Sequence, residues 1–440
     1  MGCSAAIAAM AGARVTNVAF ADPNTPDDAS GDILITVFLR GGWDALNVVV
    51  PVDGTDRGNY VAARPVIKIP VTGQGAALRI NNNGFSSLVE LGLHPSMAPL
   101  VSLYQAGHLA FVPAAGLMSD TRSHFDAMQF MELGTPGIKA TASGWITRHL
   151  ASAPWLNTPT LIDSLASGGG QPMSLSGSTS TAALTGVGGF NIGGYWKYSD
   201  LQQAALAGMY SGPDWLAQAG RETLDTIDAI NRANPGNYSP ANRASYPGGG
   251  FGDSLKMIAQ LIKINVGLRA ATVDLGGWDT HEHQGTNGGG YLSGQVDNLA
   301  RGLKAFFTDL NGCGTANFAK RTTIVTMSEF GRRVQENASE GTDHGHGSTM
   351  LVLGGGVNGG KIYGQWPGLA TAQLYDKADL AVTTDYRSVL SEIITTRLAN
   401  PNVSTVFPGF APMTLGLAKV GAVNYPCEAP RQAFLPGIRR

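Results

Sequence analysis

One run of seven residues constrains the fold of this chain more than any other feature. Ile33–Leu39 reads ILITVFL, a continuous apolar and β-branched run without polar alternation. A strand that is apolar on both faces has to be covered on both faces, which is typical of the centre of a parallel sheet. The run ends in Arg-Gly-Gly-Trp-Asp, so Asp44 lies just beyond the carboxyl end of the predicted strand.

The rest of the chain alternates between strand and helix patterns. Strands are predicted at 108–113, 270–275, 322–327 and from 350, and helices at 88–105, 199–233, 254–266, 296–310 and 385–398. A further helix is predicted to open from the polar turn at 119–124 and to run to about 133. Strands that alternate with helices indicate parallel pairing through helical crossovers. The predicted fold class is therefore α/β, with a mainly parallel central sheet and helices on both faces.

The N-terminus resembles an export signal without its basic start. Residues 2–21 are mostly small and apolar, and Ala19-Phe20-Ala21 before Asp22 fits a cleavage site. We expect a residual export signal, of the Tat type, over 1–21 and a linker over 22–31. A single domain over 32–440 follows, with a Gly/Ser/Thr-rich insertion near 164–252. The end of a lipoprotein signal at Gly2-Cys3-Ser4 and a short buried helix are the alternatives for the leader.

Composition narrows the classes of function. The 30 basic and 32 acidic residues give a net charge of −2, and no basic cluster suits a nucleic-acid partner. The 59 glycines suit a loop-rich protein of the periplasm or the extracellular space. No run after the leader approaches a transmembrane span. Because Cys3 lies in the leader, Cys313 and Cys427 are the one possible pair, either as a disulfide or as two buried thiols.

Acidic and histidine side chains gather at the predicted strand ends. Asp44, Asp279 and Glu329 each follow a strand, where open α/β sheets bind their ligands. Carboxylates that converge there repel one another unless a cation or proton compensates. Further candidate ligands are His281, His283, Asp343, His344 and His346. Such a mixed set suits a divalent metal, Zn²⁺ first and Mn²⁺ or Ca²⁺ as alternatives, and we expect the set to line one cleft. Solvated loop residues and helix caps are the competing interpretation.

The motifs at these positions resemble a known family. They are Phe38-Leu39-Arg40-Gly41-Gly42-Trp43-Asp44, Leu93-His94-Pro95, Thr121-Arg122-Ser123-His124-Phe125, Gly277-Trp278-Asp279-Thr280-His281, Ser328-Glu329-Phe330-Gly331-Arg332 and Gly341-Thr342-Asp343-His344-Gly345. With them the chain resembles, over about 33–409, the exported bacterial family known as domain of unknown function 1501. That family is in turn similar to the alkaline phosphatase–sulfatase superfamily. The resemblance implies an alkaline-phosphatase-like three-layer sandwich that transfers phosphoryl or sulfuryl groups with metal ions at its strand ends.

The resemblance also implies roles for single metal ligands. Asp44 looks like the metal carboxylate after the first strand, and Asp279 would share a metal with His281 or His283. Glu329 and His344 would complete the ligands. Phe330 departs from the pattern, because it stands where a histidine of a second metal is expected. The cysteine motif of formylglycine sulfatases is also missing, which disfavours that class.

The turn Thr121–His124 lies where the superfamily's nucleophile opens a helix. The candidate catalytic residues are therefore Ser123, Thr121 and His124, and Arg122 and Arg332 are candidate substrate-binding charges. An N-cap role for Ser123 and structural ion pairs for the two arginines stay open.

We therefore expect a metal-dependent hydrolase of phosphate, phosphonate or sulfate esters, in the cell envelope or outside the cell, with a small-molecule or glycan substrate. The alternatives are a non-catalytic, metal-stabilised binding or scaffold protein of the same fold and a metal-dependent glycan hydrolase.

Overall fold

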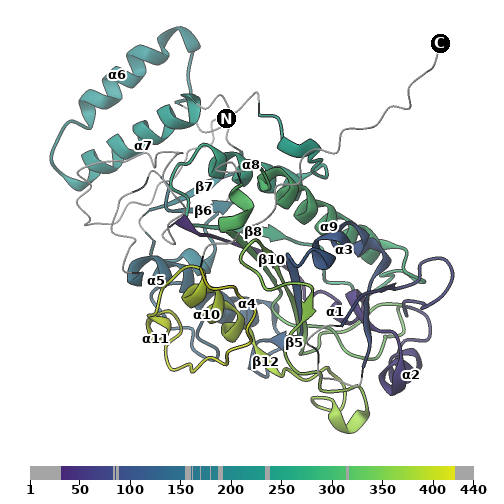
Figure 1. The fold of residues 1–440 in the computed structure, drawn as a ribbon. Helices are drawn as coiled ribbons and strands as arrows, with labels where there is room; N and C mark the ends of the chain where they lie inside the picture. Colours follow the sequence, from purple (N-terminus) through teal and green to yellow (C-terminus); the bar gives the residue numbers. More distant parts are fainter. Residues whose placement is uncertain are drawn as a thin grey trace, which may run out of the picture.

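The apolar run at the start of the domain forms β1 (Ile33–Leu39), which lies inside the main sheet (Figure 1). The computed structural model describes residues 31–421 except 83–84, 86–88, 154–159, 161, 169, 179, 187–191, 233–237 and 314–316. Within this part, β1 pairs in parallel with β8 (Ala270–Leu275) on one side and β9 (Thr322–Met327) on the other. All seven residues of β1 are buried, as the prediction of a central strand requires.

Among the described residues, the main sheet has nine strands in the order β11-β5-β10-β9-β1-β8-β6-β7, with β12 beside β5. β10 (Ser348–Gly354) is antiparallel to both of its neighbours, whereas the other pairs of this sheet are parallel. The other strands are β5 (Leu109–Gly116), β6 (Ser164–Ser167), β7 (Thr181–Leu184), β11 (Lys361–Ile362) and β12 (Thr384–Asp385). A second sheet joins β2 (Val49–Pro51), β4 (Leu91–Leu93) and β3 (Leu78–Arg79) in the order β2-β4-β3.

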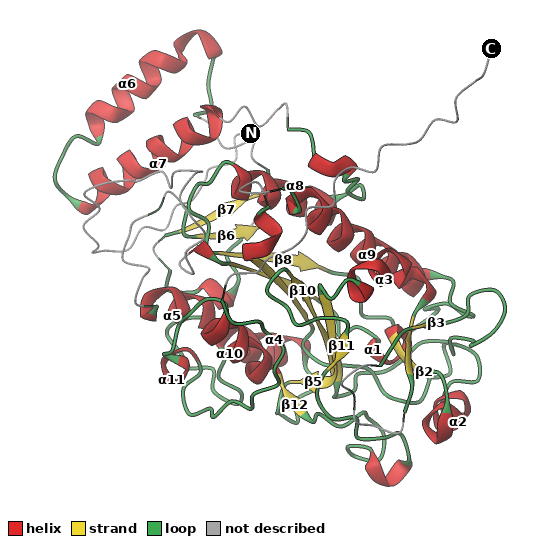
Figure 2. Ribbon diagram, in the orientation of Figure 1, coloured by secondary structure: helices red, strands yellow, loops and turns green. Residues whose placement is uncertain are grey.

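Helices cover both faces of the main sheet (Figure 2). Ile33, Ile35 and Val37 of β1 face a core shared with α3, α8 and α9, while Leu34 and Phe38 face a core shared with α4, α5 and α10. The mixed α/β class with a mostly parallel sheet is thus confirmed. The helices are α1 (Ala45–Val48), α2 (Gly54–Ala63), α3 (Ala98–Gln105), α4 (His124–Leu133), α5 (Trp145–Ser152), α6 (Ser199–Met209), α7 (Trp215–Arg232), α8 (Gly250–Lys263), α9 (Tyr291–Leu310), α10 (Tyr386–Thr396) and α11 (Val403–Val406).

The predicted helix at 88–105 is wrong in its first half. β4 occupies Leu91–Leu93 and pairs with β2, and α3 begins only at Ala98, after a short 3-10 turn at Pro95–Met97. A three-residue strand has too few residues to show a period of its own, and its partner β2 lies some 40 residues earlier in the chain. The predicted helix at 199–233 is two helices, because a break over 210–214 separates α6 from α7.

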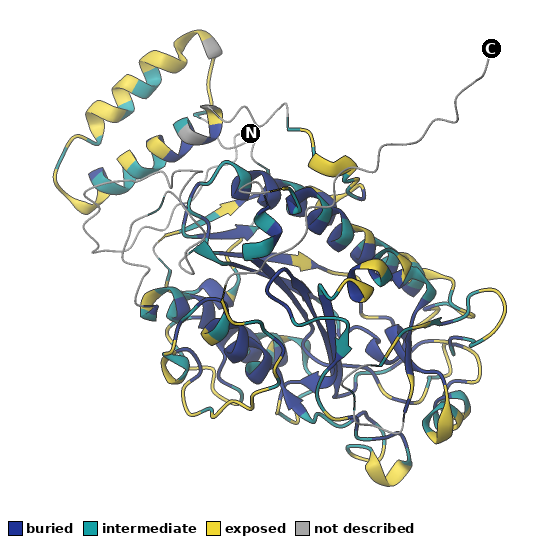
Figure 3. Cartoon of the chain, in the orientation of Figure 1, coloured by how far each residue is buried: buried dark blue, intermediate teal, exposed yellow. Residues whose placement is uncertain are grey.

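The Gly/Ser/Thr-rich stretch near 164–252 supplies both a sheet edge and a helical hairpin. Its strands β6 and β7 extend the main sheet beyond β8. Its helices α6 and α7 contact each other and stand away from the sheet, with α6 largely exposed (Figure 3). None of the helices within the described ranges has the length and apolar character that a bilayer crossing needs.

Two expectations concern the ends of the chain. The export signal over 1–21 and most of the linker lie outside the described residues, as does Cys427. Cys313, the other member of the expected pair, is disulfide-bonded.

Candidate metal centre

Four predicted residues bring their side chains together beyond the carboxyl ends of β8 and β9. His124 Nε2 lies 2.9 Å from His344 Nε2 and 3.5 Å from Asp279 Oδ2. His281 Nε2 lies 2.9 Å from His344 Nε2 and 3.1 Å from Asp279 Oδ1. His124, Asp279 and His344 place one potential ligand atom each within 4.8 Å of one another, and His281 adjoins them. We call these four residues the ligand cluster.

Each imidazole of the ligand cluster directs its other nitrogen to an oxygen acceptor. His124 Nδ1 donates to Glu329 Oε1 at 2.7 Å, and His281 Nδ1 lies 3.3 Å from Asp343 Oδ1. His344 Nδ1 lies 2.9 Å from the backbone carbonyl of Arg122, which can only accept. These contacts place the hydrogen on Nδ1 and leave the lone pair on Nε2, which is the tautomer that metal-binding histidines use.

The electrostatics of the outer acceptors support this assignment. Burial alone would raise the pKa of Glu329, but hydrogen bonds from His124 and the Gly41 backbone outweigh it and keep that pKa low. The hydrogen bond from Asn337 lowers the pKa of Asp343. Both acceptors are therefore carboxylates, which accept hydrogen bonds and cannot donate them.

The donor set fits a divalent cation. Imidazole lone pairs 2.9 Å apart repel each other unless a cation or a proton lies between them. Around a tetrahedral ion with bonds of about 2.0–2.1 Å, neighbouring ligand atoms are about 3.3 Å apart, close to the separations found here. The ligand cluster is also open to solvent, with 48% of the Asp279 side chain and 43% of the His281 side chain exposed.

Arg332 holds Asp279 in place. Its guanidinium is fully buried and donates to Asp279 Oδ1 and to the backbone carbonyls of Gly41, Gly42, Trp278 and Thr342. Burial would raise the pKa of Asp279, but this hydrogen bond and the nearby positive charge lower it, so the carboxylate is ionised. These bonds fit the structural ion pair that the sequence left open for Arg332, and its substrate-binding role stays a prediction.

Asp44 does not join the ligand cluster, contrary to its predicted role. The side chain is fully buried, and Arg64 Nη1 donates to Oδ1 at 2.9 Å and to Oδ2 at 2.7 Å. Gln284 Nε2 donates to Oδ2 at 2.8 Å. Both carboxylate oxygens are therefore occupied, and Asp44 is half of a buried ion pair.

Glu329 and Asp343 contact the histidines of the ligand cluster, whereas they were predicted to be metal ligands themselves. Each accepts a hydrogen bond from a histidine of the ligand cluster, and Glu329 Oε1 also accepts from the Gly41 backbone at 2.8 Å. A carboxylate beside a ligand imidazole orients the ring and raises its basicity, and the pKa of His124 is raised for this reason.

Two predicted histidines point elsewhere. His283 is exposed with a backbone φ of 45°, and its backbone N–H donates to Ser339. His346 is buried and stacks on Tyr375, with ring centroids 4.1 Å apart. Neither belongs to the group of converging ligand atoms.

The hydroxyls of the Thr121–His124 turn have local hydrogen bonds. Ser123 is the N-cap of α4, where its Oγ accepts from the Asp126 backbone at 3.4 Å, and Thr121 Oγ1 accepts from the Ser123 backbone at 3.2 Å. The guanidinium of Arg122 is bound by Asp376 and Asp379. His124, predicted as a catalytic residue, is instead a member of the ligand cluster.

Phe330 occupies the space beside two of the ligands. Its ring centroid lies 4.8 Å from that of His124 and 4.9 Å from that of His344, and the side chain is buried. An apolar ring here shields one side of the ligand cluster and offers no ligand atom for a second metal.

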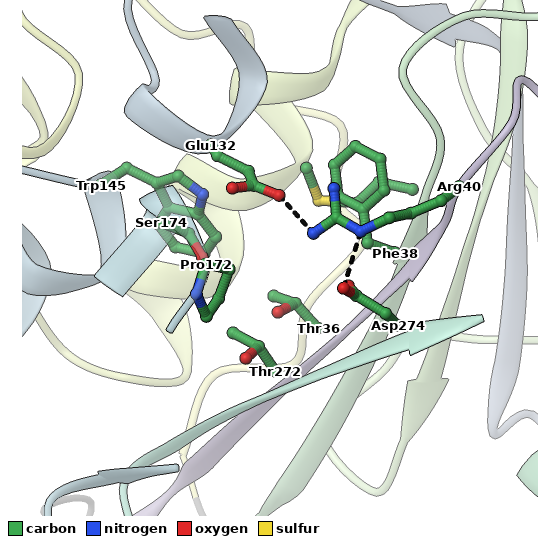
Figure 4. Close-up of a pocket in the computed structure, with 10 residues that line it drawn as sticks. Thr36, Phe38, Arg40, Glu132, Trp145, Pro172, Ser174, Thr272 and Asp274 are labelled. Atoms are coloured by element: carbon green, nitrogen blue, oxygen red, sulfur yellow. Dashed lines mark hydrogen bonds and ion pairs between the residues drawn. The ribbon is translucent and has the colours of Figure 1, made fainter. Parts of the chain in front are cut away.

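A separate polar pocket lies on the sheet face that α4 and α5 cover (Figure 4). Arg40 crosses it, 2.6 Å from Glu132 of α4 and 2.7 Å from Asp274 of β8. Thr36 and Thr272 line its floor. Because Arg40 ties α4 to β8 and the end of β1, this pocket fixes the helix whose first residue is His124.

Sequence reasoning missed the residues that hold the site together, Arg64, Gln284, Asn337, Tyr375 and Asp379. They lie outside the recognisable motifs, and their partners are distant in sequence, as for Arg122 and Asp379. A buried arginine or glutamine leaves no local pattern in a single sequence.

The family resemblance predicted from the motifs has a match over part of the chain. A model described as protein of unknown function (DUF1501) matches residues 216–396. This stretch contains Asp279, His281 and His344 of the ligand cluster, while His124 lies before it. No curated protein matches the chain.

Proposed function

We propose that this protein is a metal-dependent hydrolase whose ion is held by His124, Asp279 and His344, with His281 beside them. The observation that carries the proposal is the convergence of the His124 and His344 imidazoles with the Asp279 carboxylate, in a cluster that solvent reaches and that His281 adjoins. A closed structural site would bury its ligands, whereas a catalytic site keeps a position accessible. Imidazole nitrogens together with one carboxylate oxygen favour Zn²⁺, with Mn²⁺ as the next choice, whereas Ca²⁺ prefers an all-oxygen set.

The residues of the chain divide the work. A divalent ion bound here supplies Lewis-acid polarisation of an ester oxygen and lowers the pKa of water. Glu329, Asp343 and the Arg122 carbonyl keep the three imidazoles in the tautomer that presents Nε2. Arg332 keeps Asp279 ionised and oriented.

The finer parts of the proposal rest on the family resemblance. It favours an ester of phosphate, phosphonate or sulfate as the substrate, and an alkaline-phosphatase-like arrangement of the layers. Export to the periplasm or beyond rests on the leader, residues 1–21. A ligand cluster beyond the carboxyl ends of parallel strands supports this assignment, because ligands of open α/β sheets bind there.

The attacking group is either Ser123 or water. Ser123 immediately precedes the ligand His124, which supports the hydroxyl, and its hydrogen bond from Asp126 is long at 3.4 Å. Thr121 is the other hydroxyl of the turn. If Ser123 attacks, Ser123→Ala lowers turnover by several powers of ten with metal content intact. If Ser123 is only an N-cap, the variant loses about 0.5–2 kcal/mol of stability and keeps its rate. Thr121→Ala is the matched control.

A non-catalytic metal-stabilised protein of the same fold is the second candidate. Arg122 and Arg332, the cations expected to bind an anionic ester, are both bonded to carboxylates, which favours this alternative. A glycan hydrolase with an uncharged substrate is compatible with the same observation.

Two measurements separate the candidates. Elemental analysis of the purified protein is expected to find one divalent ion per chain, and generic aryl phosphates, phosphodiesters and aryl sulfates are expected to be turned over. Metal without turnover on any of these or on glycan substrates leaves the non-catalytic candidate. Absence of metal, with no thermal shift on adding Zn²⁺, Mn²⁺ or Ca²⁺, removes both, because an ion that binds only the native state stabilises it.

A further inference from the structure

The turn Thr121–His124 controls two members of the ligand cluster. His124 ends the turn and opens α4, and the backbone carbonyl of Arg122 accepts the hydrogen bond from His344 Nδ1 at 2.9 Å. A shift of this turn would therefore move His124 directly. It would also break the hydrogen bond that keeps the ring hydrogen of His344 on Nδ1. Residues 121–123 belong to no strand or helix, so no backbone ladder holds them and side-chain contacts help to set their position.

Those contacts come from the segment Tyr375–Asp379. Asp379 Oδ2 accepts from Arg122 Nε at 3.0 Å and from Nη2 at 2.6 Å, and Asp376 Oδ2 accepts from Nη2 at 2.9 Å. Tyr375 donates its hydroxyl hydrogen to Asp120 Oδ1 at 2.7 Å, just before the turn. Asp120, just before the turn, and Arg122 within it are thus both held by one short segment some 255 residues later in the chain.

The segment is itself a turn that two backbone hydrogen bonds close. The backbone N–H of Tyr375 donates to the carbonyl of Asp379 at 2.9 Å, and the reverse bond measures 3.0 Å. Asp376 and Lys377 between them have φ values of 50° and 56°, in the left-handed region that non-glycine residues seldom adopt. Such a conformation persists only where the surroundings hold it.

The two aspartates of the segment differ in burial. Asp379 is fully buried, and its Oδ1 has no hydrogen-bond partner among the residues that the structure describes. Arg333 Nε lies 4.0 Å from this oxygen. The side chain of Asp376 is 58% exposed. Asp379 is therefore the partner that can hold Arg122 firmly, since exposed ion pairs are screened by water.

We propose that the Arg122–Asp379 pair is a latch that positions the metal ligands His124 and His344. Arg122 acts through its main chain, and its guanidinium serves to anchor that main chain, in place of the substrate-binding role predicted for it. The inference rests on the proposed metal site and adds positioning residues to it.

Zn²⁺ affinity tests the latch, measured by competition with a chromophoric chelator on the full chain. Asp379→Asn removes the buried charge, and Arg122→Gln leaves the carbonyl but removes the anchor. Both variants are expected to bind Zn²⁺ about 10–100-fold more weakly than the native chain, as loss of an outer-shell partner does at metal sites. Asp376→Asn, the matched control on the same segment, is expected to change affinity less than about fivefold.

The visible spectrum of the Co²⁺-loaded protein supplies a readout that general destabilisation does not move. A band shift in Asp379→Asn and Arg122→Gln, absent from Asp376→Asn, supports the latch. If Asp379→Asn does not fold, Arg122→Gln decides, because its side chain is 29% exposed and its loss leaves one buried carboxylate. Native affinity and spectrum in the folded variants overturn the latch and leave the metal site standing. Failure of the native chain to bind any divalent ion overturns both.

Discussion

Two turns of identical sequence place their aspartates in opposite environments, one buried and one exposed. Gly41-Gly42-Trp43-Asp44 follows β1, and Gly276-Gly277-Trp278-Asp279 follows its parallel neighbour β8. Their tryptophan rings meet edge to face with centroids 5.6 Å apart. Yet the side chain of Asp44 is fully buried, while 48% of the Asp279 side chain is exposed beside three imidazoles.

The difference lies in the arginine that each aspartate meets. Arg64 bonds to both oxygens of Asp44, whereas Arg332 bonds to Oδ1 of Asp279 and leaves Oδ2 facing His124. A carboxylate whose two oxygens are occupied is a structural element; one with an oxygen to spare can be a ligand. The same four residues therefore specify a strand-end turn, and a residue far away in sequence specifies its role.

The largest expected effect is on Asp279. Asp279→Ala removes a ligand atom, so Zn²⁺ affinity is expected to fall by more than the roughly 10–100-fold that loss of an outer-shell partner causes. Elemental analysis after dialysis measures it. Asp44→Ala, if folded, is expected to keep its ion. Equal metal loss in both variants would erase the distinction between the turns.

The next largest effect is on the free energy of unfolding and concerns Asp44 in the turn after β1. Asp44→Asn leaves the buried Arg64 without its counter-charge and is expected to lower the free energy of unfolding by about 3–5 kcal/mol. Asp279→Asn is expected to lower it by less, because Asp279 is half-exposed and the buried Arg332 keeps the carbonyls of Gly41, Gly42, Trp278 and Thr342 as acceptors. Urea unfolding of the metal-free proteins compares them, and a larger loss for Asp279→Asn would contradict the assignment.

Glu329 connects the first turn to the ligand cluster, since Oε1 accepts from both Gly41 and His124. Glu329→Gln keeps the shape but removes the charge that supports the His124 imidazole. We expect Zn²⁺ affinity to fall about 10–100-fold, with the Co²⁺ spectrum reporting a weaker ligand field. An unchanged affinity would mean that the carboxylate only packs the turn.

The smallest expected effect is the difference in stability between variants of Trp43 and Trp278. Trp43 Nε1 donates to Ser348 Oγ at 2.8 Å, whereas Trp278 Nε1 is buried without a hydrogen-bond partner in the described part of the chain. Trp43→Phe is therefore expected to be more destabilising than Trp278→Phe by about 1 kcal/mol, since both lose similar apolar area. Thermal unfolding of the two variants side by side gives the difference, and the reverse order would refute it.

The long apolar strands could be predicted from sequence because their signal is local. β1, β8 and β9 coincide with their predicted ranges, since runs of buried β-branched residues need no knowledge of their partners. β4 and the reversed direction of β10 could not be predicted, because a short strand and a pairing direction are set by neighbours distant in sequence. Helix starts were off by a few residues, as in α8 and α9, where glycines provide the N-cap.

The candidate site was predictable as a set and not as a list of roles. Asp279, His281 and His344, all predicted as metal ligands, lie together with His124, which was predicted as a catalytic residue. The pattern could not separate them from Asp44 and Glu329, because distance from the cluster depends on Arg64 and on the position of α4. His283 and His346 share their motifs but point away, since neighbouring residues in a tight turn face different directions.

The pairing of β1 also governs how the chain reaches its native state. Leu34 pairs with Ala270 and Ile33 with Thr322. During synthesis, more than half of the sequence must therefore be made before a partner strand for either edge of β1 exists. Contacts between residues so far apart in sequence slow folding, and until they form the strand edges stay unpaired and prone to aggregation. The stretch 216–396 by itself lacks β1, β5 and α4, and we expect it to aggregate when expressed alone. We therefore expect neither half of the chain to fold by itself, because β1 and its partners β8 and β9 lie in different halves.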